Sequence, residues 1–80
     1  MKIPRDISGT DLIKYLKPYG YQVSRQSGSH IRLTTQQQGE HHITIPNHDP
    51  LKIGTLSAIL TDIALHFKKP KEEFMKEIFN

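Results

Sequence analysis

Three short segments in which apolar and polar residues alternate do most to limit the fold of this 80-residue chain. The segments span residues 21–25, 29–35 and 40–46, and turn-forming or amide residues separate them. A period of two places the apolar side chains of a strand on one face and the polar side chains on the other. Because only short connections join the segments, the sequence predicts a three-stranded antiparallel meander with one buried face and one open face.

In the first segment, residues 21–25, apolar and polar residues alternate without interruption. Tyr21 and Val23 share one face of the expected strand, and Gln22 and Ser24 share the other. The tripeptide Gln26-Ser27-Gly28 that follows has the composition of a turn, because glycine adopts backbone conformations that other residues avoid. The sequence therefore predicts that the chain reverses here and enters the second strand at residue 29.

The same alternation restricts the register of the second and third segments. Apolar residues of paired strands must share a face, so Leu33 must lie opposite Ile43 or His41. A simple loop over residues 36–39 violates this condition, and we expect a loop of three or five residues, or a bulge. Either register gathers the same polar residues on the open face: His30, Arg32, Thr34, His42 and Thr44.

Helical patterns flank the meander. Ser8 and Asp11 have the spacing of a capping box at the start of a helix over 8–17. A longer amphipathic helix begins near Gly54, and its apolar residues are Leu56, Ile59, Leu60, Ile63, Ala64 and Phe67. A last helix over 70–79 has an apolar side that we expect to pack loosely or to meet a partner. Together the elements predict one α+β domain over residues 1–80, in the order α-β-β-β-α with a short C-terminal helix.

Composition excludes several classes of protein. With no cysteine the chain has neither a disulfide framework nor a thiolate metal site, and we expect a cytoplasmic protein. No apolar run approaches the roughly 20 residues of a membrane span, so no membrane association is expected. His41 and His42 are adjacent on a strand and point to opposite faces, so we expect no metal site. The net charge of +3 permits nucleic-acid binding without requiring it.

A set of specific residues connects this pattern to a known family. In chain order they are Ser8-Gly9, Leu12, Leu16, Gly20-Tyr21, Arg25 to His30, Ile43 to Pro46, His48, Leu51 to Leu56, and Ile59-Leu60. With the predicted order of elements, they resemble the HicA toxin family, small ribonucleases of toxin–antitoxin modules. The resemblance covers most of residues 6–65. The chain departs from it at Asn47, where the family often reads Pro-His-His, and in the helix that follows Pro70.

The resemblance implies both a fold and an activity. The fold is like that of the double-stranded RNA-binding domain, in which helices cover one face of an antiparallel sheet. The implied activity is endoribonuclease cleavage of mRNA, with no small-molecule cofactor and with inhibition by a HicB-like antitoxin protein. The family motif places the catalytic histidine at His30, within Gly28-Ser29-His30.

Histidine is suited to cleaving RNA without a metal ion. The 2′-hydroxyl attacks the adjacent phosphate once a base takes its proton, and an acid protonates the leaving oxygen. Arg32, two positions after His30, is placed to stabilise charge on the phosphate, with Arg25 and Lys52 as more distant cations. The other residues expected at the substrate are Gly28 and Ser29, which support the turn, and His42 and His48, which contact RNA.

Two other functions are compatible with the sequence. The same fold can bind RNA without cleaving it, through phosphate contacts across a minor groove. Alternatively, the chain is an interaction domain whose terminal helix docks a protein partner. A cleavage assay that compares the wild type with His30→Ala in the presence of a chelator separates these functions.

Overall fold

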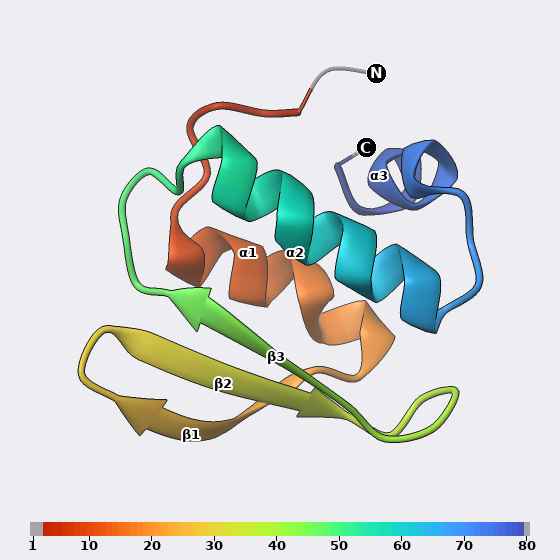
Figure 1. Cartoon of the computed structure of the whole chain (residues 1–80), viewed down its shortest axis with the longest axis horizontal. Helices are drawn as coiled ribbons and strands as arrows, with labels where there is room; N and C mark the ends of the chain where they lie inside the picture. The colour runs from red at the N-terminus through yellow and green to blue at the C-terminus, as the bar shows by residue number, and fades with distance from the viewer. Residues whose placement is uncertain (1–2, 80) are drawn as a thin grey trace.

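The computed structural model of the chain describes residues 3–79, which form one sheet and three α-helices. In chain order the elements are α1 (Gly9–Leu16), the 3₁₀ helix η1 (Lys17–Tyr19), β1 (Gln22–Ser27), β2 (His30–Thr35), β3 (His41–Pro46), α2 (Ile53–His66) and α3 (Lys71–Phe79). The sheet is antiparallel in the order β1-β2-β3, and the helices lie on one side of it (Figure 1). This topology is the predicted α+β fold of the double-stranded-RNA-binding type. None of these helices is long and apolar enough to cross a membrane.

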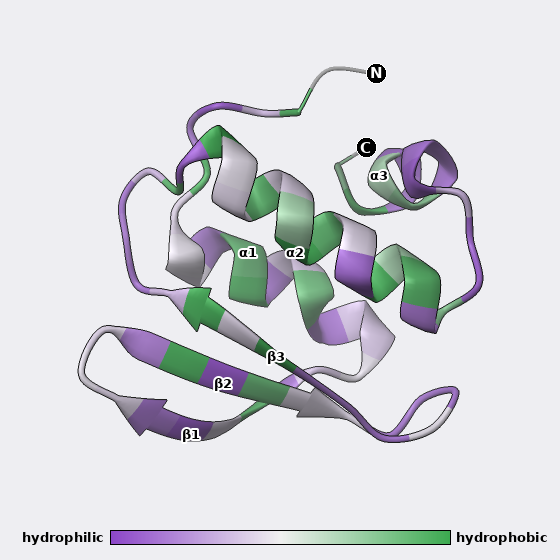
Figure 2. Cartoon of the chain, in the orientation of Figure 1, coloured by the Kyte–Doolittle hydropathy of each residue, from purple (hydrophilic) through white to green (hydrophobic). Residues whose placement is uncertain are grey.

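The pairing of β2 with β3 has one of the two registers that the alternation allows. Leu33 lies opposite Ile43, and Thr35 lies opposite His41, which leaves residues 36–40 as the loop. The loop thus has one of the two lengths that the alternation requires. The apolar residues of both strands are buried beneath the helices: Ile31, Leu33, Ile43 and Ile45. Figure 2 shows hydrophobic and hydrophilic residues alternating along β2.

β1 departs from the uninterrupted alternation predicted for it. Val23 lies opposite Leu33 and Arg25 lies opposite Arg32, so Ser24 is the extra residue of a β-bulge. A bulge sets two residues of one strand against one residue of its partner, and beyond it the faces of the strand change sides. Arg25 therefore shares the open face with Arg32, whereas unbroken alternation would have placed it with Val23.

β1 is also an edge strand that contributes little to the core. All of its residues are exposed, and Val23 retains 53% of its accessible surface. Tyr21, which precedes the strand, retains only 1%. The register agrees with the expectation that Tyr21 and Val23 share a face, but only Tyr21 reaches the core. Val23 stays exposed because the helices do not cover this part of β1.

The start of α1 is held by its own cap and by the segment that follows β3. Ser8 Oγ accepts a hydrogen bond from the Asp11 N–H at 3.0 Å, and Asp11 Oδ2 accepts one from the Ser8 N–H at 3.1 Å. This is the predicted capping box, and its bonds hold the pKa of the Asp11 carboxyl below its ordinary value. The Gly9 N–H donates to the His48 carbonyl at 2.9 Å. A Cβ at Gly9 would overlap the carbonyl oxygen of Pro46, so glycine permits this close approach.

α3 packs tightly against the rest of the chain. Phe74 is fully buried, and Met75 and Ile78 retain 3% and 7% of their accessible surface. The ring of Tyr19 meets Phe74 edge-on, with 5.1 Å between centroids, and the Tyr19 hydroxyl donates to Glu77 at 2.5 Å. The expectation of a loosely packed or partner-docking terminal helix is therefore wrong. Its apolar side is already buried inside the chain.

We expect Gly9→Ala to lower the free energy of unfolding by about 1–3 kcal/mol, because the added methyl overlaps Pro46. Gly54→Ala is the matched control, since Gly54 also lies in the first turn of a helix but has open space around an added Cβ. That variant should gain about 0.5–1 kcal/mol from the higher helix propensity of alanine. Urea unfolding measures both, and equal stability of the two variants would contradict the close contact.

The burial of α3 predicts that Phe74→Ala destabilises the fold by about 3–5 kcal/mol, because it leaves a cavity where a fully buried ring was. Leu65→Ala removes a side chain that is 72% exposed and should change stability by less than about 0.5 kcal/mol. Thermal unfolding followed by circular dichroism compares the two. A small effect of Phe74→Ala would show that α3 is dispensable.

Candidate nucleic-acid interface

The turn between β1 and β2 delivers His30 to the open face of the sheet. Gly28 has a φ of +59°, in the region that favours glycine. It is the first of the two residues between Ser27 and His30, which pair across the strands, and hairpin turns of this length favour glycine there. His30 is exposed, and within residues 3–79 its side chain has no hydrogen bond or ion pair. Its imidazole is therefore accessible to a substrate.

Backbone contacts place the segment after β3 beside this turn. His30 lies opposite Pro46, and the next residue, Asn47, donates its N–H to the Ser29 carbonyl at 2.6 Å. The backbone of Ser29, rather than its side chain, thus makes the contact that holds the turn. His48 is exposed and follows directly, with its carbonyl bound to the start of α1. The structure therefore brings His48 to the same end of the sheet as His30.

The bulge in β1 brings two arginines together next to His30. Arg25 lies directly opposite Arg32, both residues are exposed, and Arg32 shares its strand face with His30. Like charges directly opposite each other across a sheet are destabilising. Neither arginine forms a salt bridge with any residue that the structure describes. An anion bound between the two guanidinium groups would relieve their repulsion.

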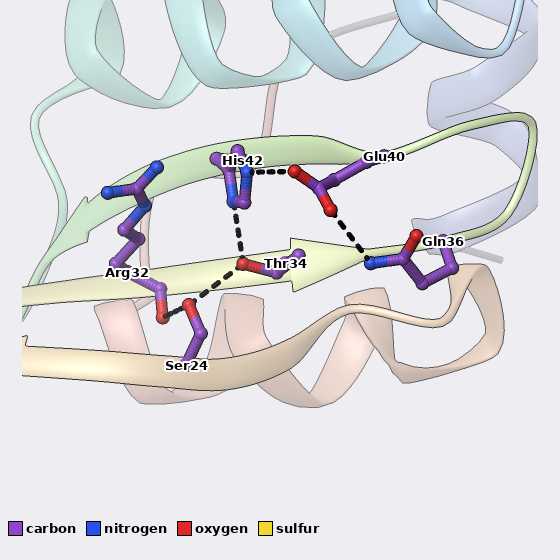
Figure 3. A network of polar contacts seen from close by, with 6 residues as sticks. All are labelled: Ser24, Arg32, Thr34, Gln36, Glu40 and His42. Carbon is purple, nitrogen blue, oxygen red and sulfur yellow. Dashed lines mark hydrogen bonds and ion pairs between the residues drawn. The ribbon is translucent and has the colours of Figure 1, made fainter.

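Farther along the open face lies a connected polar network of Ser24, Arg32, Thr34, Gln36, Glu40 and His42 (Figure 3). Nδ1 of His42 is 2.7 Å from the Thr34 hydroxyl, and its Nε2 is 3.0 Å from Glu40 Oε2. Glu40 also accepts a hydrogen bond from the Gln36 amide at 3.3 Å. The bond to His42, and then that to Gln36, hold the pKa of the Glu40 carboxyl below its ordinary value. Glu40 is therefore ionised at neutral pH.

Lys52 does not join this group. It is the exposed N-cap residue of α2, and the start of α2 lies in the helix layer, away from the open face of the sheet (Figure 1). The predicted site residues that the structure does gather on the open face and its adjoining turn are Arg25, Gly28, Ser29, His30, Arg32 and His42, with His48 at one end.

A second group of histidines joins the start of β3 to α2. Nδ1 of His41 is 2.7 Å from the Tyr21 hydroxyl, Nε2 is 3.1 Å from Asp62, and the ring stacks on His66 with 4.4 Å between centroids. Burial and the nearby charge of Asp62 raise the pKa of the Tyr21 hydroxyl well above its ordinary value. With both nitrogens of His41 engaged, this group is structural. Within residues 3–79 no three His, Cys, Asp or Glu side chains are arranged to hold a metal ion.

Three members of the network were missed from the sequence: Ser24, Gln36, and Glu40 as the partner of His42. A signal for the bulge was present, since the run of polar residues from Ser24 through Gln26 does not alternate with apolar ones. A signal for Glu40 was present as well, because it precedes His42 by two positions and so has the same strand parity.

The accessibility of His30 predicts its chemical reactivity. Diethylpyrocarbonate acylates exposed, unprotonated imidazole, so we expect it to modify His30 several-fold faster than His41, whose two nitrogens are hydrogen-bonded. Peptide mass mapping of briefly treated protein at neutral pH measures both sites in one sample. Faster modification of His41 would contradict the exposed position of His30.

Comparisons with known proteins add a family to this geometry. Searches of curated proteins and of solved structures found no significant match. The family model for the HicA toxin of bacterial toxin-antitoxin systems matches residues 9–65, from the first residue of α1 nearly to the end of α2. The match includes β1, β2 and β3 and therefore the whole open face of the sheet. The chain belongs to the HicA toxin family.

Proposed function

We propose that the protein is an endoribonuclease that cleaves mRNA by acid–base catalysis at His30, as the toxin of a toxin–antitoxin module. The observation that carries the proposal is the cross-strand pair of Arg25 and Arg32 beside an exposed histidine. Two cations held opposite each other on an open face, with no salt bridge to a residue that the structure describes, favour a polyanion. An accessible imidazole next to them is the group that RNA cleavage near neutral pH requires.

The chemistry needs no metal ion or small-molecule cofactor. His30 takes the proton of a 2′-hydroxyl or gives a proton to the leaving 5′-oxygen. The 2′-oxygen bonds to phosphorus as the P–O5′ bond breaks, which leaves a cyclic phosphate on one product and a 5′-hydroxyl on the other. The guanidinium of Arg32 stabilises the negative charge that builds on the phosphate, with Arg25 opposite it.

The remaining residues act in binding the RNA. Gly28 and Ser29 form the turn that holds His30, and the absence of a side chain at Gly28 lets the substrate approach the backbone closely. His42 and His48 contact the RNA on either side of the cleavage point, and Lys52 contributes only long-range attraction from the helix layer. Toxins of this family pair with HicB antitoxins, and a HicB-like protein is the partner that we propose for this chain.

A second candidate function is RNA binding without cleavage. It is favoured by one observation: no side chain among residues 3–79 orients the imidazole of His30 through a hydrogen bond. Catalytic histidines are commonly oriented by a partner on the second nitrogen. In this alternative the arginine pair binds phosphates, and His30 is one more contact.

The two functions are separated by an RNA cleavage assay with excess chelator. We expect His30→Gln to reduce the cleavage rate by at least about 100-fold, because general acid–base catalysis contributes about that much or more. His66→Gln is the matched control, since His66 lies on α2 away from the open face and glutamine can keep its bond to the Gln37 carbonyl. Full activity of His30→Gln would overturn the catalytic role, and RNA binding without cleavage by the wild type would favour the second function.

A further inference from the structure

The hydrogen bonds beside His42 have a direction that follows from what each group can donate. The carbonyl oxygen of Arg32 only accepts, so the Ser24 hydroxyl donates to it at 3.3 Å. A hydroxyl has one proton, and the Thr34 hydroxyl therefore donates to Ser24 at 2.8 Å. Thr34 then has no proton left for Nδ1 of His42, which lies 2.7 Å away. That contact requires Nδ1 to carry a proton.

The other ring nitrogen must donate as well. Glu40 Oε2 lies 3.0 Å from Nε2 of His42, and an ionised carboxylate only accepts. All four contacts (Figure 3) form together only when His42 is protonated on both nitrogens. If Nδ1 carried no proton, it would accept a hydrogen bond from the Thr34 hydroxyl. The Ser24 hydroxyl would then have to donate to Thr34, and its bond to the Arg32 carbonyl would be lost. Making all four contacts at once therefore requires a charged imidazole.

The charged groups that face His42 among the described residues have opposite effects on the protonation of its ring. Glu40, from the loop before β3, favours the protonated ring. Arg32 on β2 and Arg25 on β1 oppose it, and Arg32 also acts on Glu40 by lowering the pKa of its carboxyl. His30 is the other titratable residue on this face of the described sheet. The helices lie on the opposite side (Figure 1).

We infer that the protonated His42 neutralises Glu40 and leaves the Arg32 guanidinium available to bind a phosphate of single-stranded RNA. The open face thus holds a second, proton-dependent phosphate subsite. When His42 loses its proton, the carboxylate of Glu40 competes with the RNA for Arg32 and repels it. Thr34 is a positioning residue, because it accepts from Nδ1 and so favours the charged ring.

The subsite deepens the proposed function and rests on it for the nature of the ligand. His42 lies opposite Thr34, four positions along β2 from His30, a distance of about 13 Å at about 3.3 Å per residue. One phosphate cannot contact both histidines over that distance. An RNA strand that runs along β2 presents the scissile phosphate to His30 and the next phosphate near His42. Arg32, which lies between the two histidines on the same face, contacts both phosphates.

The test measures binding of a 2′-O-methyl RNA oligonucleotide, which lacks the attacking hydroxyl. His30→Gln protein is the parent, so that His30 does not contribute to the pH dependence. We expect the Kd of the parent to rise about fivefold between about pH 6 and about pH 8 at fixed salt, as imidazole loses its proton. Adding His42→Gln should weaken binding at pH 6 to the level that the parent shows at pH 8.

The decisive variant is Glu40→Gln, which should bind about fivefold more tightly than the parent at pH 8, because the competing carboxylate is gone. Glu73→Gln is its control, since it removes the same charge from an exposed position on α3, outside the sheet. Equal gains from the two substitutions, or a parent Kd that does not change with pH, would overturn the subsite. A parent that binds no RNA would overturn both the subsite and the proposed function. RNA cleavage by the parent, with the expected binding pattern intact, would overturn only the catalytic role of His30.

The protonation of His42 also has a spectroscopic signature. In ¹⁵N-histidine NMR spectra at about pH 6, we expect both ring nitrogens of His42 to carry protons in the parent. Thr34→Val removes the acceptor of Nδ1 and should lower the protonated fraction, whereas Thr44→Val, on the same face but outside the network, should not. An unchanged spectrum in Thr34→Val would contradict the direction of the hydrogen bonds.

Discussion

The pairing of β2 with β3 is the constraint on which the rest of the structure depends. Because Leu33 lies opposite Ile43, the next pair along the strands, Thr34 and His42, falls on the open face. A shift of one residue would exchange the two faces and expose the core of the sheet. The register that buries the apolar residues is therefore the same register that assembles the polar interface. Stability and the candidate site cannot be changed independently along these two strands.

The edge strand β1 can contain a bulge without disturbing the core, which β2 and β3 cannot. None of its residues is buried, so the bulge at Ser24 moves no apolar side chain out of the core. The same bulge in β2 would expose Ile31 or Leu33, both of which lie beneath the helices. In β1 the bulge disturbs only local pairing, and it turns Arg25 to the open face. The strand that contributes least to stability is thus the one adapted to the interface.

The parts of the fold that follow from periodicity could be predicted, and the parts that depend on distant contacts could not. Alternation along β2 and β3 limited the register to two alternatives, one of which is observed, and the Ser8 cap marked the start of α1. Burial of α3 depends on whether Phe74 finds a place in the core, which no local pattern reports. The exposure of Val23 depends likewise on how far the helices reach across the sheet. In the candidate site, the face of β1 on which Arg25 lies could not be predicted without knowing that the strand contains a bulge.

The adjacent histidines of β3 show how neighbouring groups decide the role of a side chain. His41 turns toward Tyr21, whose raised pKa keeps a proton on its hydroxyl, so a neutral ring can accept at Nδ1 and donate to Asp62 from Nε2. His42 meets the Thr34 hydroxyl, whose proton is committed elsewhere, and therefore needs protons on both nitrogens. The two histidines are adjacent in the chain, and the period of the strand places them on opposite faces of the sheet. It places one in a structural contact with Tyr21 and Asp62 and the other in the polar network on the face that we propose binds RNA.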